Sequence, residues 1–352
     1  MQRRPWIALP LVGFALLISG CGGMDWSPDG TKIVTAWQSG ADHTVLGVVD
    51  LRTGVRRALP GSGDAMNPRW SPDGRWIAIN RWVGGSQIAH VHDLLTGKTA
   101  AMGVRDCSTF VWREDSARLL VCTNEAALCY AIPDLAPTWE AKLPPQASAV
   151  VTGAWIPDTD AVALLASNDL WLIEGAEVSR LTTTGDVLGF GIRPGAKELI
   201  WARASRNPRY ILLSLYAMPI KERSARRLPM PYRVAEINPS PRAPITAVGP
   251  VSFSPDGRHM AVTCVFVPAG RKKGTESARV FVMDLNGRNA RLPYPEKLGQ
   301  PLLPVGPTSF SPDGRRLSLT IGTQKTARLW VCNADGTGGR IVMTTSLSQK
   351  TR

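Results

Sequence analysis

The sequence predicts an all-β protein, a seven-bladed β-propeller with four antiparallel strands per blade. A turn motif recurs along the chain, and most of its copies are spaced by the length of four short strands. Gly (33 residues) and Pro (28 residues) are also too frequent for long helices. Six or eight blades are alternatives, because the spacing widens in the fifth and sixth units.

The motif is an aromatic residue followed by Ser-Pro-Asp-Gly. Near-identical copies begin at Trp26, Trp70, Phe253 and Phe310, and degenerate copies at Trp112, Trp155 and Gly191. The seven starts are separated by 44, 42, 43, 36, 62 and 57 residues. Pro presets φ for a tight turn, Asp bonds nearby backbone, and Gly takes the left-handed conformation. We therefore expect each copy to join the first two strands of a blade, with its aromatic residue between blades; a ring of metal-binding carboxylates is the alternative.

Each unit continues with an apolar strand, a second strand, an Asx-Gly or Thr-Gly turn and a last short strand. The predicted blades span residues 24–66, 67–106, 107–147, 148–185, 186–245, 246–303 and 304–352. The chain begins with an innermost strand and ends with an outermost one in this scheme. We therefore expect the ring to close by side-chain packing, without a strand shared between the first and last blades.

The aromatic-Ser-Pro-Asp-Gly-x-x-apolar pattern resembles the WD-like repeat of the TolB-type β-propeller family, and similar repeats occur in relatives of prolyl oligopeptidase. The resemblance covers residues 24–352 and implies a propeller over that range. The amino-terminal α/β domain of TolB has no counterpart, because the first copy begins three residues after Gly23. The resemblance therefore implies the fold without implying a role in the Tol–Pal system.

Residues 1–20 are predicted to be an export signal. Arg3 and Arg4 precede a 13-residue apolar run, which is too short to span a bilayer, and the run ends in Ile18-Ser19-Gly20-Cys21. Small residues before a cysteine resemble the lipobox of bacterial lipoproteins, in which the cysteine is acylated and becomes the mature N-terminus. We therefore expect a lipidated Cys21, with 21–23 as a short tether; an ordinary cleavable signal is the alternative.

The residue after the cysteine indicates which membrane holds the protein. In lipoproteins of double-membraned bacteria, an Asp at this position resembles an inner-membrane retention signal. This chain has Gly22 instead. In a double-membraned organism we expect the periplasmic face of the outer membrane. In other organisms we expect the outer face of the plasma membrane.

Five cysteines remain in the mature chain: Cys107, Cys122, Cys129, Cys264 and Cys332. The cell envelope permits disulfides, and an odd count leaves at least one thiol unpaired. A hairpin centred between Glu125 and Ala126 would place Cys122 opposite Cys129, within reach of a disulfide. Cys107 as a competing partner and buried free thiols are the alternatives.

Signatures of catalysis are absent from the sequence. There is no Gly-x-Ser-x-Gly elbow, phosphate-binding loop, dinucleotide fingerprint or paired-histidine zinc helix. His90 and His92 share a face of the predicted third strand of blade 2, but no third ligand is identifiable. We therefore expect no metal and no other cofactor.

Positive charge is concentrated in one unit. The formal charge of +13 falls to +11 without the leader, and residues 186–245 alone carry +7. Predicted turns of blades 5 and 6, on the face where the innermost strands begin, hold six basic residues: Arg203, Arg206, Arg209, Arg271, Lys272 and Lys273. We expect them to contact anionic headgroups beside the lipid; a merely solvated basic face is the alternative.

These observations predict a monomeric, membrane-anchored, non-enzymatic lipoprotein of the cell envelope. Its propeller would bind or scaffold a protein or an envelope polymer, and an exported lipoprotein would not meet nucleic acid. The alternative is an enzyme of lactonase or lyase type acting at the channel mouth. A convergent set of Asp, Glu, Asn or His side chains there would distinguish the enzyme, and the loops between blades show no such set in the sequence.

Overall fold

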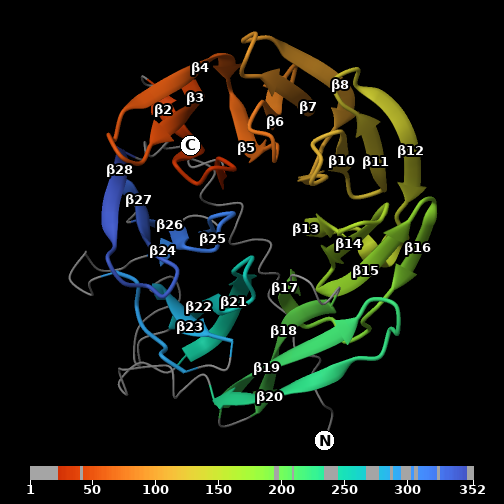
Figure 1. Ribbon diagram of the computed structural model, residues 1–352, viewed down its shortest axis with the longest axis vertical. Helices are drawn as coiled ribbons and strands as arrows, with labels where there is room; N and C mark the ends of the chain where they lie inside the picture. The colour runs from red at the N-terminus through yellow and green to blue at the C-terminus, as the bar shows by residue number, and fades with distance from the viewer. Residues whose placement is uncertain are drawn as a thin grey trace, which may run out of the picture.

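The computed structural model describes residues 23–39, 43–193, 198–207, 210–233, 245–266, 277–285, 288–294, 303–304, 308–322 and 326–346. They form seven antiparallel sheets around a common axis, with the first strand of each blade nearest the axis and the last at the periphery (Figure 1). The predicted seven-bladed propeller is confirmed.

Blades 1 to 4 each contain four strands in chain order. Blade 1 consists of β1 (Met24–Trp26), β2 (Lys32–Ser39), β3 (His43–Asp50) and β4 (Arg56–Gly63). Blade 2 consists of β5 (Ala65–Trp70), β6 (Trp76–Val83), β7 (Ser86–Asp93) and β8 (Thr99–Arg105). Blade 3 consists of β9 (Thr109–Trp112), β10 (Arg118–Cys122), β11 (Ala126–Ala131) and β12 (Ala136–Lys142). Blade 4 consists of β13 (Val150–Trp155), β14 (Ala161–Ala166), β15 (Asp169–Glu174) and β16 (Glu177–Arg180).

Blades 5 to 7 are less regular. Blade 5 consists of β17 (Val187–Arg193), β18 (Glu198–Asn207), β19 (Tyr210–Pro219) and β20 (Arg226–Arg233). Blade 6 has β21 (Ile245–Phe253), β22 (His259–Phe266) and β23 (Ser277–Asp284), with a bridge from Val282 to Arg291 where a fourth strand would lie. Blade 7 has β24 (Leu303–Pro304), β25 (Ser309–Phe310), β26 (Arg316–Gly322), β27 (Thr326–Asn333) and β28 (Arg340–Ser346). Part of the wide spacing in blade 5 comes from its ten-residue strands β18 and β19.

The Ser-Pro-Asp-Gly turns have the predicted geometry. In the first, the Gly30 amide donates to the Ser27 carbonyl (2.8 Å), and Gly30 has a φ of +64°. The Ser27 hydroxyl donates to the Asp29 carboxylate (2.6 Å), which also accepts the Thr31 amide (2.9 Å). The same Ser–Asp bond recurs in blades 2, 6 and 7. Each Asp therefore holds its own turn, as the structural interpretation of the motif predicted.

The fifth copy of the motif is displaced by one residue from its predicted position. Arg193 pairs with Glu198 across this turn, as Ser27 does with Lys32, so Ile192 and not Gly191 occupies the aromatic position. A Cβ atom on Gly191 would lie 3.0 Å from the Cβ of Phe253. Contact with the neighbouring blade therefore favours glycine at position 191. The sequence alone does not show that the motif begins one residue later.

The hydrophobic core is divided among the seven interfaces between neighbouring blades, because each apolar cluster draws its residues from two adjacent sheets. Successive residues of a strand point to opposite faces, and β6 illustrates the consequence. Its Ile77 and Ile79 pack toward blade 1, whereas Ala78 packs toward blade 3. A strand in this fold is therefore apolar on both sides.

Tryptophans of the turn motif also bond between blades. The indole N–H of Trp112 donates to the Arg69 carbonyl (3.0 Å), and that of Trp155 donates to the Val111 carbonyl (2.9 Å). In each case the acceptor lies on the innermost strand of the preceding blade. The predicted packing of these aromatic residues between blades is confirmed.

In the described residues, blades 1 and 7 meet without exchanging a strand, as predicted. This interface is called the closure seam. It is built from Met24, Trp26, Ile33, Val49, Leu51, Leu329, Val331 and Met343. The Trp26 indole donates to the Ser309 carbonyl (3.1 Å), and the Arg340 guanidinium donates to the Leu51 carbonyl. Side chains alone therefore close the ring in the described residues, and β28 lies beside β2 (Figure 1).

Within the part of the chain that the structure describes, no helix has the length and apolar character needed to cross a bilayer.

Candidate functional site

The blades expose two different faces. The turn face carries the turns between the first and second strands and between the third and fourth strands of each blade. The start face, at the opposite end, carries the beginnings of the innermost strands and the turns between second and third strands. These assignments follow from the up-and-down order of the strands.

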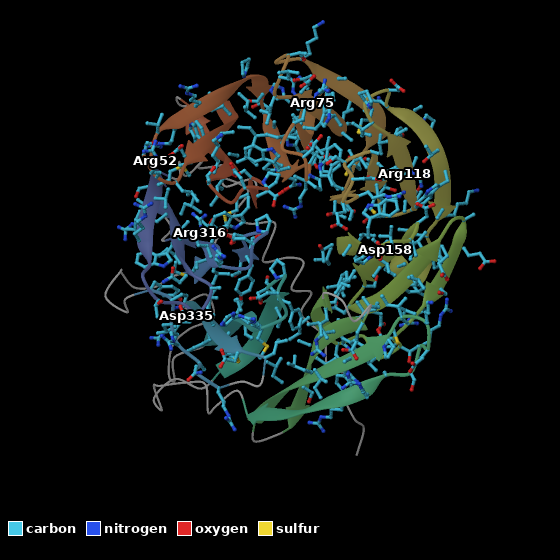
Figure 2. The ribbon with its side chains drawn as sticks, viewed as in Figure 1. Arg52, Arg75, Arg118, Asp158, Arg316 and Asp335 are labelled. Carbon is cyan, nitrogen blue, oxygen red and sulfur yellow. The ribbon has the colours of Figure 1, made fainter. Side chains whose placement is uncertain are left out.

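Side chains of the turn face are spread around the ring. Figure 2 labels six that come from turns or adjoining strand starts of five blades: Arg52, Arg75, Arg118, Asp158, Arg316 and Asp335. Arg75 Nη2 lies 3.0 Å from Asp93 Oδ2, and this hydrogen bond lowers the pKa of Asp93 to about 2. The Arg316 guanidinium lies over the Trp26 ring, 5.6 Å from its centroid. Several charges on this face therefore have structural partners in their own or a neighbouring blade.

The basic excess of blade 5 is partly neutralised. Glu198 is buried, and its two carboxylate oxygens accept hydrogen bonds from Arg193 (2.8 Å) and Arg226 (2.5 Å). Arg223 reaches across to Glu174 of blade 4 (2.8 Å). These contacts lie toward the turn face, so these three arginines do not contribute to a basic patch on the start face.

A polar cluster occupies the start face between blades 4 and 5. Asp169 is buried and accepts hydrogen bonds from Arg180 (2.5 Å), the Thr182 hydroxyl (2.7 Å) and the backbone amides of Thr184 and Gly185. Burial raises the pKa of Asp169, but the hydrogen bonds outweigh it, so the pKa lies below its usual value. Asp169 is therefore a fixed, ionised acceptor at the start of β15.

The same cluster contains Arg203, one of the residues predicted to contact a membrane. Its Nε and Nη2 atoms donate to the two carboxylate oxygens of Asp186 (2.6 and 3.0 Å). The guanidinium lies 5.1 Å from the Tyr216 ring centroid, and the side chain is 26% exposed. Arg203 thus links β18 to the loop that precedes β17 and is paired in this arrangement.

The cluster of Asp169, Arg180, Thr182, Thr184, Asp186 and Arg203 was not anticipated from the sequence. It combines the turn between β14 and β15 with the loop between blades 4 and 5, and no spacing rule links those segments. The one feature of the sequence that could have indicated this cluster is the run from Thr182 to Asp186, which holds three hydroxyl groups and a carboxylate. Its two carboxylates are balanced by two arginines.

The other residues of the predicted membrane-binding set are not placed. Cys21, Arg209, Arg271, Lys272 and Lys273 lie outside the described residues, as does the side chain of Arg206. Lipidation and the basic surface formed by these residues remain predictions.

The predicted Cys122–Cys129 disulfide is corrected by the register of its hairpin. Cys122 pairs with Ala127 and Cys129 pairs with Leu120, so the turn is centred one residue earlier than the disulfide requires. Both thiols are free and buried. Burial raises the pKa of each, and Cys107, at the start-face end of blade 3, has its pKa raised by burial to about 12.

His90 and His92 lie on β7, the third strand of blade 2, as predicted. Both are buried, and burial lowers their pKa values. His90 Nδ1 contacts the Ile88 carbonyl (2.9 Å), and His92 Nδ1 contacts the Thr99 hydroxyl (2.8 Å). Among the described residues, no group of three or more His, Cys, Asp and Glu side chains is placed to hold a metal ion.

Comparison with known proteins supports the fold. No family model matches the chain, and no curated protein does. Among solved structures, the β-propeller domain of the Trilobed protease from Pyrococcus furiosus, which has an open velcro topology, matches with a TM-score of 0.59 at 14% identity, over 89% of this chain and 92% of that one.

Two further structures cover similar shares of this chain. Oligogalacturonate lyase in complex with manganese has a TM-score of 0.59 at 14% identity, over 94% of this chain and 91% of that one. TolB from Acinetobacter baumannii has a TM-score of 0.47 at 16% identity, over 94% of this chain and 64% of that one.

These comparisons correct the expectation that the chain is not an enzyme. The solved structures that share its propeller include part of a protease and a lyase. At such identities the likeness establishes the fold, and this fold serves enzymes as well as binding proteins.

Proposed function

We propose that the chain is a lipid-anchored β-propeller of the bacterial cell envelope, built from TolB-type repeats, that recognises a protein or an envelope polymer through its turn face. The observation that carries this proposal is the direction of β1. This strand begins at Met24 on the start face and leads into a turn on the opposite face. An acyl group on Cys21 would hold the start face toward the bilayer and leave the turn face open.

The structure of the turn face supports a role in recognition. Its exposed cations include Arg52, Lys98, Arg258 and Arg315 from four different blades. They stand on turns whose backbones are fixed by internal hydrogen bonds. A turn whose backbone is already fixed loses less conformational entropy on binding than a mobile loop. Together with the net charge of +11 that remains without the leader, this favours an anionic partner.

A second candidate function is polymer cleavage at the axis of the propeller. The match to oligogalacturonate lyase favours it, because almost the whole of that chain aligns with this propeller. Asp169 and Asp186 lie in one cluster on the start face, although Asp169 stands on β15, the third strand out from the axis. Both already bind arginine, so cleavage would require the polymer to displace those contacts.

Lipidation is tested by metabolic labelling with a fatty acid. We expect wild-type protein to incorporate the label and Cys21→Ser to incorporate none, because the thiol is the predicted acceptor. A serine variant that still carries the fatty acid would contradict the anchor.

Recognition is tested by purification from detergent-solubilised membranes. We expect the double variant Arg52→Gln/Arg315→Gln, on blades 1 and 7 of the turn face, to retain less partner than wild type. Arg105→Gln on the start face is the matched control and should retain as much. Loss of the partner in Arg105→Gln alone would contradict recognition by the turn face. Recovery of shortened polymer in place of intact polymer would favour the lyase candidate.

A further inference from the structure

The hairpin between β6 and β7 ends in an exposed apolar tip. Trp82 is 48% exposed and Val83 is 46% exposed, and they occupy consecutive positions. Gly84 and Gly85, with φ of +58° and +85°, form the two-residue turn, which the Val83–Ser86 pair closes. Consecutive strand residues point to opposite faces, so the tip is apolar on both sides. Packing within a blade does not explain an apolar end that projects beyond the sheet.

The tip lies beside the point where the chain enters the propeller. The Trp82 amide donates to the Asp64 carbonyl (3.2 Å), just before β5. Gly23 lies against the same strand, because a Cβ atom on it would be 3.1 Å from Asn67 Cα. Asp64 and Asn67 are three residues apart, about 10 Å along a strand. Cys21 precedes Gly23 by two residues, a reach of about 7 Å at full extension.

Charges around the tip balance one another. Arg81 lies on β6 and Arg105 at the end of β8, and Arg105 Nη1 donates to the Ser86 hydroxyl beside the turn (3.2 Å). Two exposed carboxylates, Asp64 and Asp106, lie at the same end of the blade. Attraction to an anionic surface is therefore weak here, and transfer of apolar surface out of water is the available driving force.

These observations identify the occupant as a lipid bilayer. Trp is favoured at the membrane–water interface, where its ring meets acyl chains and its N–H stays hydrated. Acyl chains on Cys21 and an apolar tip on the same face would add their free energies of membrane binding. A protein partner would not explain why the tip lies beside the strand against which Gly23 packs.

We propose that the β6–β7 tip inserts Trp82 and Val83 into the interfacial layer of the membrane beside the acylated Cys21. This inference rests on the proposed function, which places the start face against the bilayer. It gives the membrane contact an apolar component that is separate from the predicted basic surface.

The test compares two single-cysteine labels on the full chain, purified from membranes and reconstituted into vesicles. Val83→Cys places an environment-sensitive fluorophore at the tip. Leu95→Cys places it in the β7–β8 turn of the same blade, on the turn face, where Leu95 is 78% exposed. The cysteines of the described residues are buried and would not compete for the label. Trp82→Cys is a second tip position, should Val83→Cys fail to fold.

We expect the tip label to shift to the blue and to be quenched by lipid-borne quenchers, while the Leu95→Cys label stays in water. The shift should be equal in phosphatidylcholine vesicles and in vesicles containing phosphatidylglycerol, because the driving force is apolar. Equal signals from the two positions, or a tip signal that requires anionic lipid, would overturn the proposal.

Fatty-acid labelling of the same preparations separates this proposal from the anchor. Acylated protein with an exposed tip label would refute insertion and leave the anchor standing. Protein without an acyl group but with a buried tip label would refute the anchor and support insertion.

Discussion

Tryptophan side chains join the blades through their ring nitrogen as well as through their apolar surface. Trp112 and Trp155 each donate to an inner-strand carbonyl of the preceding blade. Trp70 instead donates to its own turn, at the Gly74 carbonyl (3.0 Å), and its backbone amide donates to Asp25 (2.7 Å). Blades 1 and 2 are therefore joined by a carboxylate where other interfaces use an indole.

The glycine that ends each Ser-Pro-Asp-Gly turn avoids backbone strain, and in blade 7 it also avoids a clash with the neighbouring turn. We expect Gly314→Val to lower the free energy of unfolding by more than about 1 kcal/mol, because it forces a β-branched residue into a φ of +68°. Its Cβ would also lie 3.1 Å from Asp256 Cγ in the neighbouring turn. Urea unfolding followed by circular dichroism measures the change.

Gly54→Val is the control for the clash. Gly54 has a φ of +72° with no atom within 4 Å of its Cβ position, so this variant adds strain without crowding. Gly314→Val should be the more destabilising of the two. An equal loss in both variants would mean that contact between the turns of blades 6 and 7 adds nothing.

At the scale of strands and hairpins, the end of β7 is fastened to the preceding turn by a carboxylate. Asp93 accepts hydrogen bonds from Arg75 (3.0 Å) and from the Leu95 amide (2.8 Å). Asp50 occupies the same place at the end of β3 and accepts the Arg52 and Thr53 amides without an arginine side chain. The turn after the third strand is therefore held by an arginine side chain in blade 2 but, among the described residues, not in blade 1.

This difference predicts a specific dependence of stability on acid. The Arg75 hydrogen bond lowers the pKa of Asp93 from 3.8 to about 2, so the unfolded state binds the proton more readily than the folded state. The resulting stabilisation is fully present above pH 3.8 and is lost as the pH falls toward 2. Asp93→Asn should flatten this part of the stability curve, measured by thermal unfolding at a series of pH values.

Asp50→Asn is the matched comparison for this measurement and should change the acid limb less, because Asp50 lacks the arginine. If both variants kept the slope of the wild-type curve between pH 4 and pH 2, the contribution of the Asp93–Arg75 pair would be excluded.

Local sequence patterns predicted those elements whose geometry is set by local chemistry. The Ser-Pro-Asp-Gly turns and the order of strands within a blade follow from residues close together in the chain. The fifth turn was displaced by one residue because contact with Phe253, a residue of the next blade, favours glycine at Gly191. The Cys122–Cys129 pairing failed because a one-residue change in a turn moves the register by two.

The polar cluster on the start face was beyond prediction for a related reason. Asp169 and Arg203 belong to different blades, and they meet only because blades 4 and 5 pack side by side. Charge counting gave blade 5 a large positive excess, whereas four of its arginines are held by Asp186, Glu198 and Glu174. Composition measures charge, but only the fold determines which charges are paired.

At the scale of the whole molecule, the closure seam determines whether seven blades form a ring. We expect Trp26→Phe to destabilise the protein by about 1 kcal/mol, because it removes the indole bond to Ser309 and keeps most of the apolar contact. Trp70→Phe removes a bond within one turn. Urea unfolding measures both, and proteolysis at the ends of the described chain should accelerate only in Trp26→Phe.

A larger loss in Trp70→Phe, or unchanged proteolysis in Trp26→Phe, would contradict the assignment of Trp26 to closure. Double substitution with Ser309 is uninformative here, because the acceptor is a backbone carbonyl.

The closure seam also has a mechanical consequence. Neighbouring blades 1 to 5 are tethered by short connecting segments, whereas within the described residues blades 1 and 7 share no strand and only side chains join them. A seven-bladed ring opened at that seam keeps six of its seven interfaces, so opening is far less costly than unfolding. A membrane anchor at Cys21 would pull directly on β1, the strand that borders the seam. Tension between the membrane and a partner bound on the turn face would therefore load the closure seam first.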